Sequence, residues 1–550
     1  MDGAPVYEHG SESDKHLPPP AADADIELNR GLKGRHITMI SIGGVLGTGL
    51  FLYTGSALAE GGPLGILLAY SLMGTMCYAV MISLGEMVSA MPLPGGAITL
   101  AARYVDSSLS FTVGYFYWYT WTIFLPSELA ALSVLINLWN DTISNAAWIS
   151  LFLIAAVTVN MLGTAWFGEL EFWLSYLKIF LVVGLLITSI VISAGGGPDG
   201  QPIGFKYWRD PGPFVQYAGL GGTLGRFLGF WATLTRAAFA YIGSEIVAIA
   251  AGETRNPRVN VPRAIKNVYI RILLFYIGGV FAIGITVPSN DPRLALNAGS
   301  ALASPFVIAI STAGIKVLPT VVNAGLIASG WSAANSELFT SSRALHGLAL
   351  RGHAPRFFAR TANNGVPYVA IVTCALFASL AFMSLGSSAG VAFGYLASLG
   401  AAGGLLMWWS TCVTYIRFER GLRAQGVDRA ALPYASKLNH RAAAAWYAAV
   451  LITIVLFFSG WSVFLKGNWS APVFCTTYLP IILYPVVYCA HKIYSKSKLV
   501  PYNQMVFYEQ TEDGEEEQVG EKSKWRRVVA AVVCLDGSGG CEGCGGVDGL

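Results

Sequence analysis

Charged residues are scarce in this chain of 550 residues, at 12% of the sequence against 54% hydrophobic residues. That is about half the charge of an ordinary globular protein, which argues against a set of soluble domains. The charges nearly balance, with a formal net charge of +3, so the strongly basic surface typical of nucleic-acid binding is missing. The composition therefore predicts that most of the chain is surrounded by lipid.

Other signals are missing too. The opening MDGAPVYEHGSESDKHLPPP has no apolar segment, so no cleaved signal peptide is expected, and the first membrane helix is expected to direct targeting. Most cysteines are scattered through apolar stretches and imply no disulfide framework. Cys534, Cys541 and Cys544 have neither a histidine nor a fourth cysteine nearby, so no zinc site is expected. HExxH does not occur, and no metal, cofactor or enzymatic activity is predicted.

Apolar runs of the length that crosses a bilayer, roughly 20 residues, recur along the sequence. They predict an all-α integral membrane protein with about twelve transmembrane helices, at 37–58, 64–90, 111–139, 146–163, 173–194, 227–251, 267–288, 317–338, 367–386, 391–416, 445–466 and 471–491. The polar ends are predicted to be tails, with disorder over 1–35 and a second tail over 493–550, on either side of a transporter domain at 36–492.

The lysine and arginine bias of the loops gives the orientation. With both termini in the cytoplasm, 21 of these residues fall in inner segments and six in outer ones. The two glycosylation sequons, at Asn140 and Asn468, then both fall in outer loops. We therefore predict that both termini are cytoplasmic.

The first apolar run contains GGVLGTGLF, Gly43 to Phe51, with glycines crowded at membrane depth. Non-helical backbone at that depth is tolerated only where it is buried in protein or lines a cavity. A helix interrupted there presents free amides to an anion and free carbonyls to a cation, which suits a zwitterion such as an α-amino acid. Tight helix packing through small residues explains this segment alone equally well.

The sixth run, AAFAYIGSEIVAIAAGE from Ala237 to Glu253, is interrupted in the same way, with Gly243 followed by Glu245. The first and sixth runs occupy equivalent places in two five-helix halves, at about 37–194 and 227–416. Paired interruptions of this kind indicate a transport site near the bilayer midplane, between inverted repeats.

Ionisable residues inside the predicted spans are candidates for function. Glu128 and Glu245 are candidate proton acceptors, and Lys178 either snorkels to the interface or changes its charge during a cycle. Arg236 could reach an outer vestibule, pair with Glu128 or Glu245, or bind a substrate carboxylate. For Glu86, near the inner end of its span, cytoplasmic solvation is an adequate explanation.

The aromatic run YFYWYTW in the third span, Tyr115 to Trp121, is interpreted as an interface belt or as packing rather than a ligand cage.

Several motifs in order carry a family resemblance: LNRGLKGRHITMISIGGVLGTGLF, GEM with PLPGGA, LEFWLSYLK, FAYIGSEIVAIAAGETRNPRVNVPRAI, GIKVLPTVVNAGLIASGWSAANSELFTSSRAL and GVPYVA. Over about residues 29–510 the chain resembles fungal amino-acid permeases of the amino acid/polyamine/organocation superfamily. The resemblance implies a five-plus-five inverted-repeat core with broken helices 1 and 6, two appended helices at about 445–491, and proton-driven amino-acid uptake at the plasma membrane. Arg236 stands where many relatives have an uncharged residue.

By motif position, the resemblance implies that the Thr48 and Gly49 amides bind the substrate carboxylate, and that the carbonyls of Val45, Phe239 and Ile242 bind its ammonium group. Phe239 would also gate the site, and the Lys178 ammonium would stand where related carriers bind sodium. The full predicted substrate-binding set is Gly43, Gly44, Val45, Gly47, Thr48, Gly49, Arg236, Phe239, Ala240, Tyr241 and Ile242, and the proton-coupling and gating set is Glu128, Lys178 and Glu245.

The segments VPSNDPRL, from Val287 to Leu294, and NWSAPVFCTTYLPIILYPV look most like the dicarboxylic permeases, which makes glutamate and aspartate candidate substrates. The expected partners are an amino acid, a proton and the bilayer, and, by analogy only, ubiquitin-dependent endocytic machinery acting near Lys15. A broadly specific permease for neutral amino acids and a nutrient receptor that signals without flux remain alternatives.

Overall fold

The computed structural model describes residues 39, 46–93, 95–139, 142–198, 200–246, 265, 268–294, 304–385 and 389–507. Within these ranges the regular structure is helical, with no strand. Nine helices there are long and apolar enough to cross a membrane: Tyr53–Ala90, Ser107–Ile136, Asn145–Leu162, Thr164–Ser193, Val268–Thr286, Tyr368–Leu385, Ala389–Ala424, Lys437–Phe464 and Ala471–Ser495. The prediction of an all-α membrane protein is confirmed.

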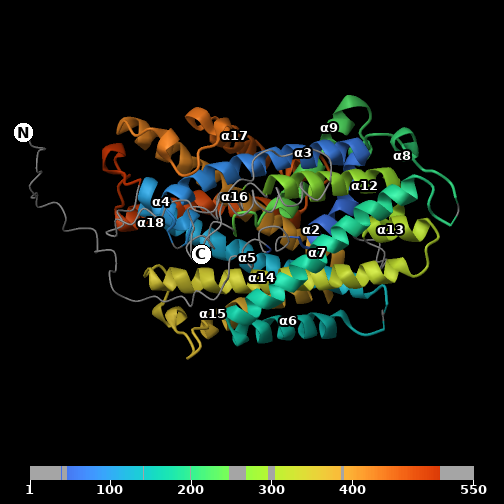
Figure 1. Cartoon of the computed structure of the whole chain (residues 1–550), viewed down its shortest axis with the longest axis horizontal. Coiled ribbons are helices and arrows are strands. Elements are labelled where there is room, and N and C mark those ends of the chain that lie inside the picture. The colour runs from blue at the N-terminus through green and yellow to red at the C-terminus, as the bar shows by residue number, and fades with distance from the viewer. Residues whose placement is uncertain are drawn as a thin grey trace, which may run out of the picture. The chain divides into compact units, whose positions relative to one another are not determined.

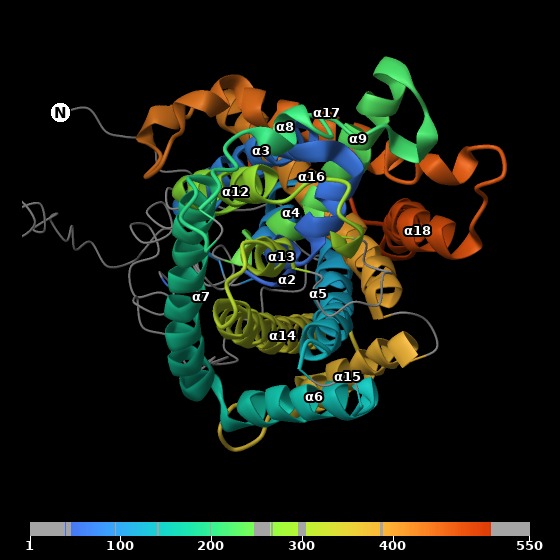
Figure 2. The ribbon, with the colours of Figure 1, turned by 90° about the vertical axis from the view of Figure 1, so that its right-hand side faces the viewer.

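One helix forms the centre of the packing. Helix α5 (Ser107–Ile136) lies between α14 (Leu318–Leu350) and α16 (Ala389–Ala424) and is buried along almost its whole length. Helix α3 (Tyr53–Ala90) packs against α9 (Gly222–Tyr241). Figure 2 shows α6 (Asn145–Leu162) and α7 (Thr164–Ser193) outside this inner group. The core therefore contains the helices predicted to form the site.

The outer helices expose apolar side chains. Phe180 and Trp173 on α7, Ile154 on α6 and Phe457 on α17 (Ala443–Phe458) are all more than half exposed. In α6 and α18 (Ala471–Ser495), only 17% of the most apolar 18-residue stretch is buried. Exposed apolar area on this scale is expected of a surface that faces lipid tails.

Several boundaries differ from the predicted spans. Helix α3 covers the end of the first predicted span and all of the second, and Gly62, with φ +75°, marks the kink between them. A β-carbon at Gly62 would lie 2.8 Å from the carbonyl oxygen of Pro213, so both the conformation and the space favour glycine. Helix α7 begins at Thr164, before the predicted 173, and α14 ends at Leu350, after the predicted 338.

Two helices end or begin inside apolar runs, and both labels are visible in Figure 1. The short helix α2 (Thr48–Phe51) begins at Thr48, and α3 follows it directly after Leu52. Helix α9 ends at Tyr241, where Ile242 is extended and Gly243 has φ +102°. Both ends leave main-chain groups without helical partners next to the core.

The prediction for Glu86 is wrong. Its carboxyl is fully buried rather than solvated by the cytoplasm. It accepts hydrogen bonds from Tyr415 Oη at 2.5 Å, Arg429 Nε at 2.9 Å and the Ser436 amide at 2.8 Å. Because Arg429 and Ser436 lie between α16 and α17, this carboxylate fixes that connection to α3. The sequence could not show the partner, which lies more than 300 residues away.

The chain after α18 packs back onto the helices. Phe507 is buried and stacks on Tyr104 of α4 (Ala97–Tyr104), with ring centroids 6.0 Å apart. The Gln425 side chain donates to the carbonyls of Tyr502 and Met505 at 2.7 and 2.8 Å. Residues 500–507 are thus attached to the end of α16 and to α4.

We expect the Glu86→Ala variant to lose about 3 kcal/mol of stability, because removing one partner leaves the largely buried Arg429 guanidinium uncompensated. The matched control is Glu419→Ala, which breaks an ion pair with the half-exposed Arg423 and should cost less, because the guanidinium left behind is solvated. Thermal unfolding of the purified protein in detergent measures both. Equal shifts of the two variants would contradict the structural role of Glu86.

Candidate functional site

The site begins where α2 starts. The Thr48 amide donates to both carboxylate oxygens of Glu128, at 3.2 and 3.3 Å. Glu128 lies on α5 and is almost completely buried. The first amides of a helix have no partner within the helix and favour a negative charge. The main-chain group predicted to hold a substrate carboxylate therefore holds the carboxylate of Glu128.

Two glycines allow close contacts at this helix start. A β-carbon at Gly47 would lie 2.7 Å from Glu128 Oε1, and one at Gly49 would lie 2.9 Å from the Phe239 ring and 3.1 Å from the Ala240 Cα. Helix α2 can therefore approach both the carboxylate and α9 only without side chains at these two positions.

The end of α9 supplies the other half of the site. The Gly243 amide donates to Glu245 Oε2 at 3.0 Å instead of continuing the helix. The last carbonyls of a helix have no amide four residues ahead, and in α9 they include that of Phe239, which is predicted to bind an ammonium group. Ile242, also predicted to do so, follows the helix in an extended conformation. The end of α9 and the start of α2 thus bring main-chain acceptors and donors to one place.

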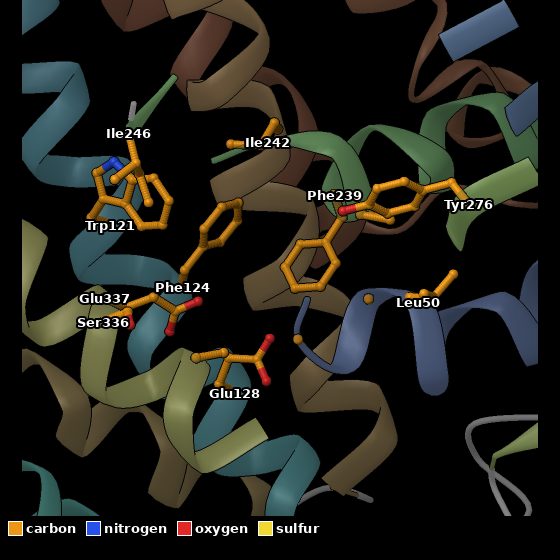
Figure 3. Close-up of a pocket in the computed structure, with 14 residues that line it drawn as sticks. Leu50, Trp121, Phe124, Glu128, Phe239, Ile242, Ile246, Tyr276, Ser336 and Glu337 are labelled. Carbon is orange, nitrogen blue, oxygen red and sulfur yellow. The ribbon is translucent and has the colours of Figure 1, made fainter. Parts of the chain in front are cut away.

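A small cavity of about 30 Å³ lies between these ends, with room for only one or two water molecules. Figure 3 shows Glu128 from α5 and Glu337 from α14 on the same side of it, with the Glu128 carboxylate pointing toward the start of α2. The lining residues are Gly47, Gly49, Leu50, Trp121, Phe124, Glu128, Phe239, Ala240, Ile242, Ile246, Tyr276, Ala333, Ser336 and Glu337. Trp121, which the sequence assigned to a belt or packing, lines this cavity.

Aromatic rings separate this inner cavity from a larger one. Phe239 makes edge-to-face contacts with Tyr53, Phe124 and Phe393, with ring centroids 5.6, 5.0 and 5.7 Å apart. Phe239 lines the inner cavity, whereas Tyr53 lines a cavity of about 510 Å³ between α3, α9, α16, α17 and α18.

Arg236 lines the larger cavity and forms an ion pair with Glu60, with Nε 2.7 Å from Oε2. The guanidinium also lies over the ring of Tyr53, 5.1 Å from its centroid. Both charged side chains are about a quarter exposed. Arg236 therefore pairs with Glu60 rather than with Glu128 or Glu245.

Lys178 is fully buried, so the snorkelling interpretation is wrong. Its ammonium lies 3.3 Å from Glu171 Oε1, and the Ser332 hydroxyl donates to Glu171 Oε2 at 2.7 Å. Lys178 and Glu171 both lie on α7, which begins earlier than predicted, and Ser332 lies on α14. The buried ion pair thus lies within α7, and the hydrogen bond from Ser332 joins it to α14.

Glu245 connects the end of α9 to α16. Its Oε2 accepts from the Trp408 indole at 3.1 Å as well as from the Gly243 amide. The next residue back, Ser244, accepts a hydrogen bond from the buried Arg271 guanidinium. Among the described residues, Glu245, Trp408, Ser244 and Arg271 thus form a group of polar contacts at the end of α9.

The structure brings most of the predicted residues together but adds four that the sequence reasoning missed: Glu60, Glu171, Arg271 and Glu337. Glu171 and Glu337 fell outside or at the very end of predicted spans, although both lie inside motifs already quoted. Extending the predicted spans over the whole of those motifs would have placed both residues within membrane helices. The predicted residues Gly43, Gly44 and Val45 lie outside the described residues.

A multi-pass helical membrane protein in which helices begin and end at a buried cavity has the arrangement of a solute carrier. Residues 36–503 match the family described as amino acid permease. The chain belongs to this family, whose members are transporters and not enzymes.

Curated relatives differ in what they carry. The chain is 38% identical to the dicarboxylic amino acid permease of Saccharomyces cerevisiae, over 92% of this chain and 84% of that protein. It is 39% identical to the lysine-specific permease of the same yeast, over 86% and 77%. It is 37% identical to the proline-specific permease of Emericella nidulans, over 87% and 88%. The family is thus shown, while the relatives span acidic, basic and neutral substrates.

We expect Gly49→Ala to reduce amino-acid uptake by about tenfold or more, because the added methyl forces Phe239 and α2 apart and misplaces binding groups. Gly184→Ala on α7 is the matched control, since a β-carbon there meets nothing within 4 Å. Uptake is normalised to protein at the cell surface. Similar uptake by the two variants would show that the close contact at Gly49 has no role in transport.

Proposed function

We propose that the protein is a proton-coupled amino-acid importer of the plasma membrane. The observation that carries the proposal is the pair of hydrogen bonds from the Thr48 amide to the Glu128 carboxylate. The amide group that suits a substrate carboxylate is occupied by an ionisable side chain.

This contact supplies a route for coupling. An incoming substrate carboxylate competes with Glu128 for the Thr48 amide. Once displaced, the Glu128 carboxyl loses a hydrogen bond that favours its charged form, while it remains in a buried cavity that disfavours charge. Protonation of Glu128 then accompanies substrate binding, and its release on the inner side completes the coupling. In this proposal Lys178 takes part through its ion pair with Glu171, and Glu245 through its contact with Trp408.

The two cavities fit one stage of an alternating-access cycle. The larger cavity can hold an amino acid, whereas the inner cavity of about 30 Å³ cannot. We propose that Phe239 moves to admit the substrate, and that breaking the contacts of Glu245 with Trp408 then opens the inner side.

For the substrate we propose acidic amino acids. The similarity to a dicarboxylic amino acid permease and the guanidinium of Arg236 in the vestibule support this assignment. Within the VPSNDPRL segment, Asp291 and Arg293 pair with each other at 2.6 Å. We propose that the Arg236 guanidinium releases Glu60 and binds the side-chain carboxylate of the substrate instead.

Basic amino acids are the second candidate. The inner cavity is lined by the carboxyls of Glu128 and Glu337, which suit a cationic side chain, and a lysine-specific permease is among the relatives. Cytoplasmic termini and ubiquitin-dependent removal from the surface belong to the proposal as well. Lys15, the residue named for that removal, lies outside the described residues.

The test is uptake of radiolabelled glutamate, lysine and leucine in permease-deficient cells at pH 5 and pH 7.5. We expect glutamate uptake to be stimulated by acid and to fall by about tenfold or more in Arg236→Gln, because a desolvated charge pair with the substrate is lost. Glu60→Gln is the matched control, which breaks the same ion pair but leaves the guanidinium in place. It should retain glutamate uptake.

Other results separate the alternatives. Acid-stimulated lysine uptake that resists Arg236→Gln would favour the basic candidate, and leucine uptake equal to glutamate uptake would favour a broadly specific permease. Binding of an amino acid without flux of any of the three would identify a receptor and reject the transporter.

A further inference from the structure

A second carboxyl lines the inner cavity besides Glu128. Glu337 lies on α14, is 6% exposed, and reaches the cavity beside Ser336. Its Oε2 is buried and has no hydrogen-bond partner among the described residues. A buried ionised carboxylate normally collects several donors, as Glu86 does in this structure. Glu337 lacks that environment and faces the space that a substrate must enter.

The charges around Glu337 do not balance when every group is ionised. Glu128 on α5 and Lys178 on α7 both act on it electrostatically. Lys178 also pairs with Glu171, so these described residues comprise three carboxyls and one ammonium group. The phenol of Tyr276 lines the same cavity. Two like charges in one buried site cannot both remain ionised without a large cost, so the cluster favours a bound proton.

We propose, on the basis of the proposed transport function, that Glu337 is a second proton-carrying residue of this permease. A proton from the outer solution binds the Glu337 carboxylate as the substrate enters the cavity, and the same proton leaves to the inner solution after the substrate. Only the O–H bond of the Glu337 carboxyl forms and breaks in this step. Glu128 and Glu337 then move two protons with each amino acid, which offsets the negative charge of an acidic substrate.

The measurement is the pH dependence of KM for glutamate, together with the number of protons taken up per glutamate in proteoliposomes. Each obligatory proton contributes up to about tenfold in KM per pH unit. Glu337→Gln imitates the protonated carboxyl. We therefore expect the slope of log KM against pH to be smaller by one in this variant than in the wild type. The proton count per glutamate should fall from two to one.

Two further variants act as controls. Glu337→Asp keeps an ionisable group and should keep the wild-type slope and proton count. Glu419→Gln removes a buried carboxyl that pairs with Arg423 on α16, outside both cavities, and should change neither. Thermal stability and glutamate binding of the purified variants show whether each is folded.

Three outcomes would overturn the inference. Glu337→Gln could show the same slope and proton count as the wild type. It could lose lysine uptake alone with the slope unchanged, which would make Glu337 a selectivity residue. It could also be folded and inactive together with Glu337→Asp, which would make its role structural. The proposed function fails separately, if the wild-type protein itself shows no acid-stimulated uptake of any amino acid.

Discussion

A helix that begins at membrane depth must find acceptors for its first amides, since no water is available in the hydrocarbon. Here the acceptor of the Thr48 amide is the Glu128 carboxylate. That requirement explains the glycines at 47 and 49, which let the carboxylate and α9 come close. It also fits the position of α5, the helix that supplies Glu128, which is buried along almost its whole length.

The charged groups of the core form two kinds of arrangement. Glu86 is saturated by Tyr415, Arg429 and Ser436, and its role is to hold a connection in place. Glu128 and Glu337, in contrast, line a cavity with few donors. All three carboxyls are buried, so burial alone does not separate Glu86 from the other two. The number of donors and the access to a cavity separate them.

Sequence reasoning predicted the class of fold and the two interrupted segments well, because hydropathy and glycine spacing are local properties. It was less successful with partners. Glu60 pairs with Arg236 from 176 residues away, and no local pattern reveals such a pair. Glu171 and Glu337 were missed for a different reason. Glu171 lies before the predicted start of its span at 173, and Glu337 lies at the end of the span 317–338, whereas α7 begins at Thr164 and α14 continues to Leu350.

The segment after α18 has a mechanical consequence. Phe507 is wedged against Tyr104 and Phe418, and Gln425 holds the main chain just before it. Phe418 and Trp408 lie on the same helix, α16, and Trp408 contacts Glu245 at the inner end of the site. The docking of residues 500–507 and the contact with Glu245 therefore involve one and the same rigid element, so any displacement of α16 would disturb both ends together.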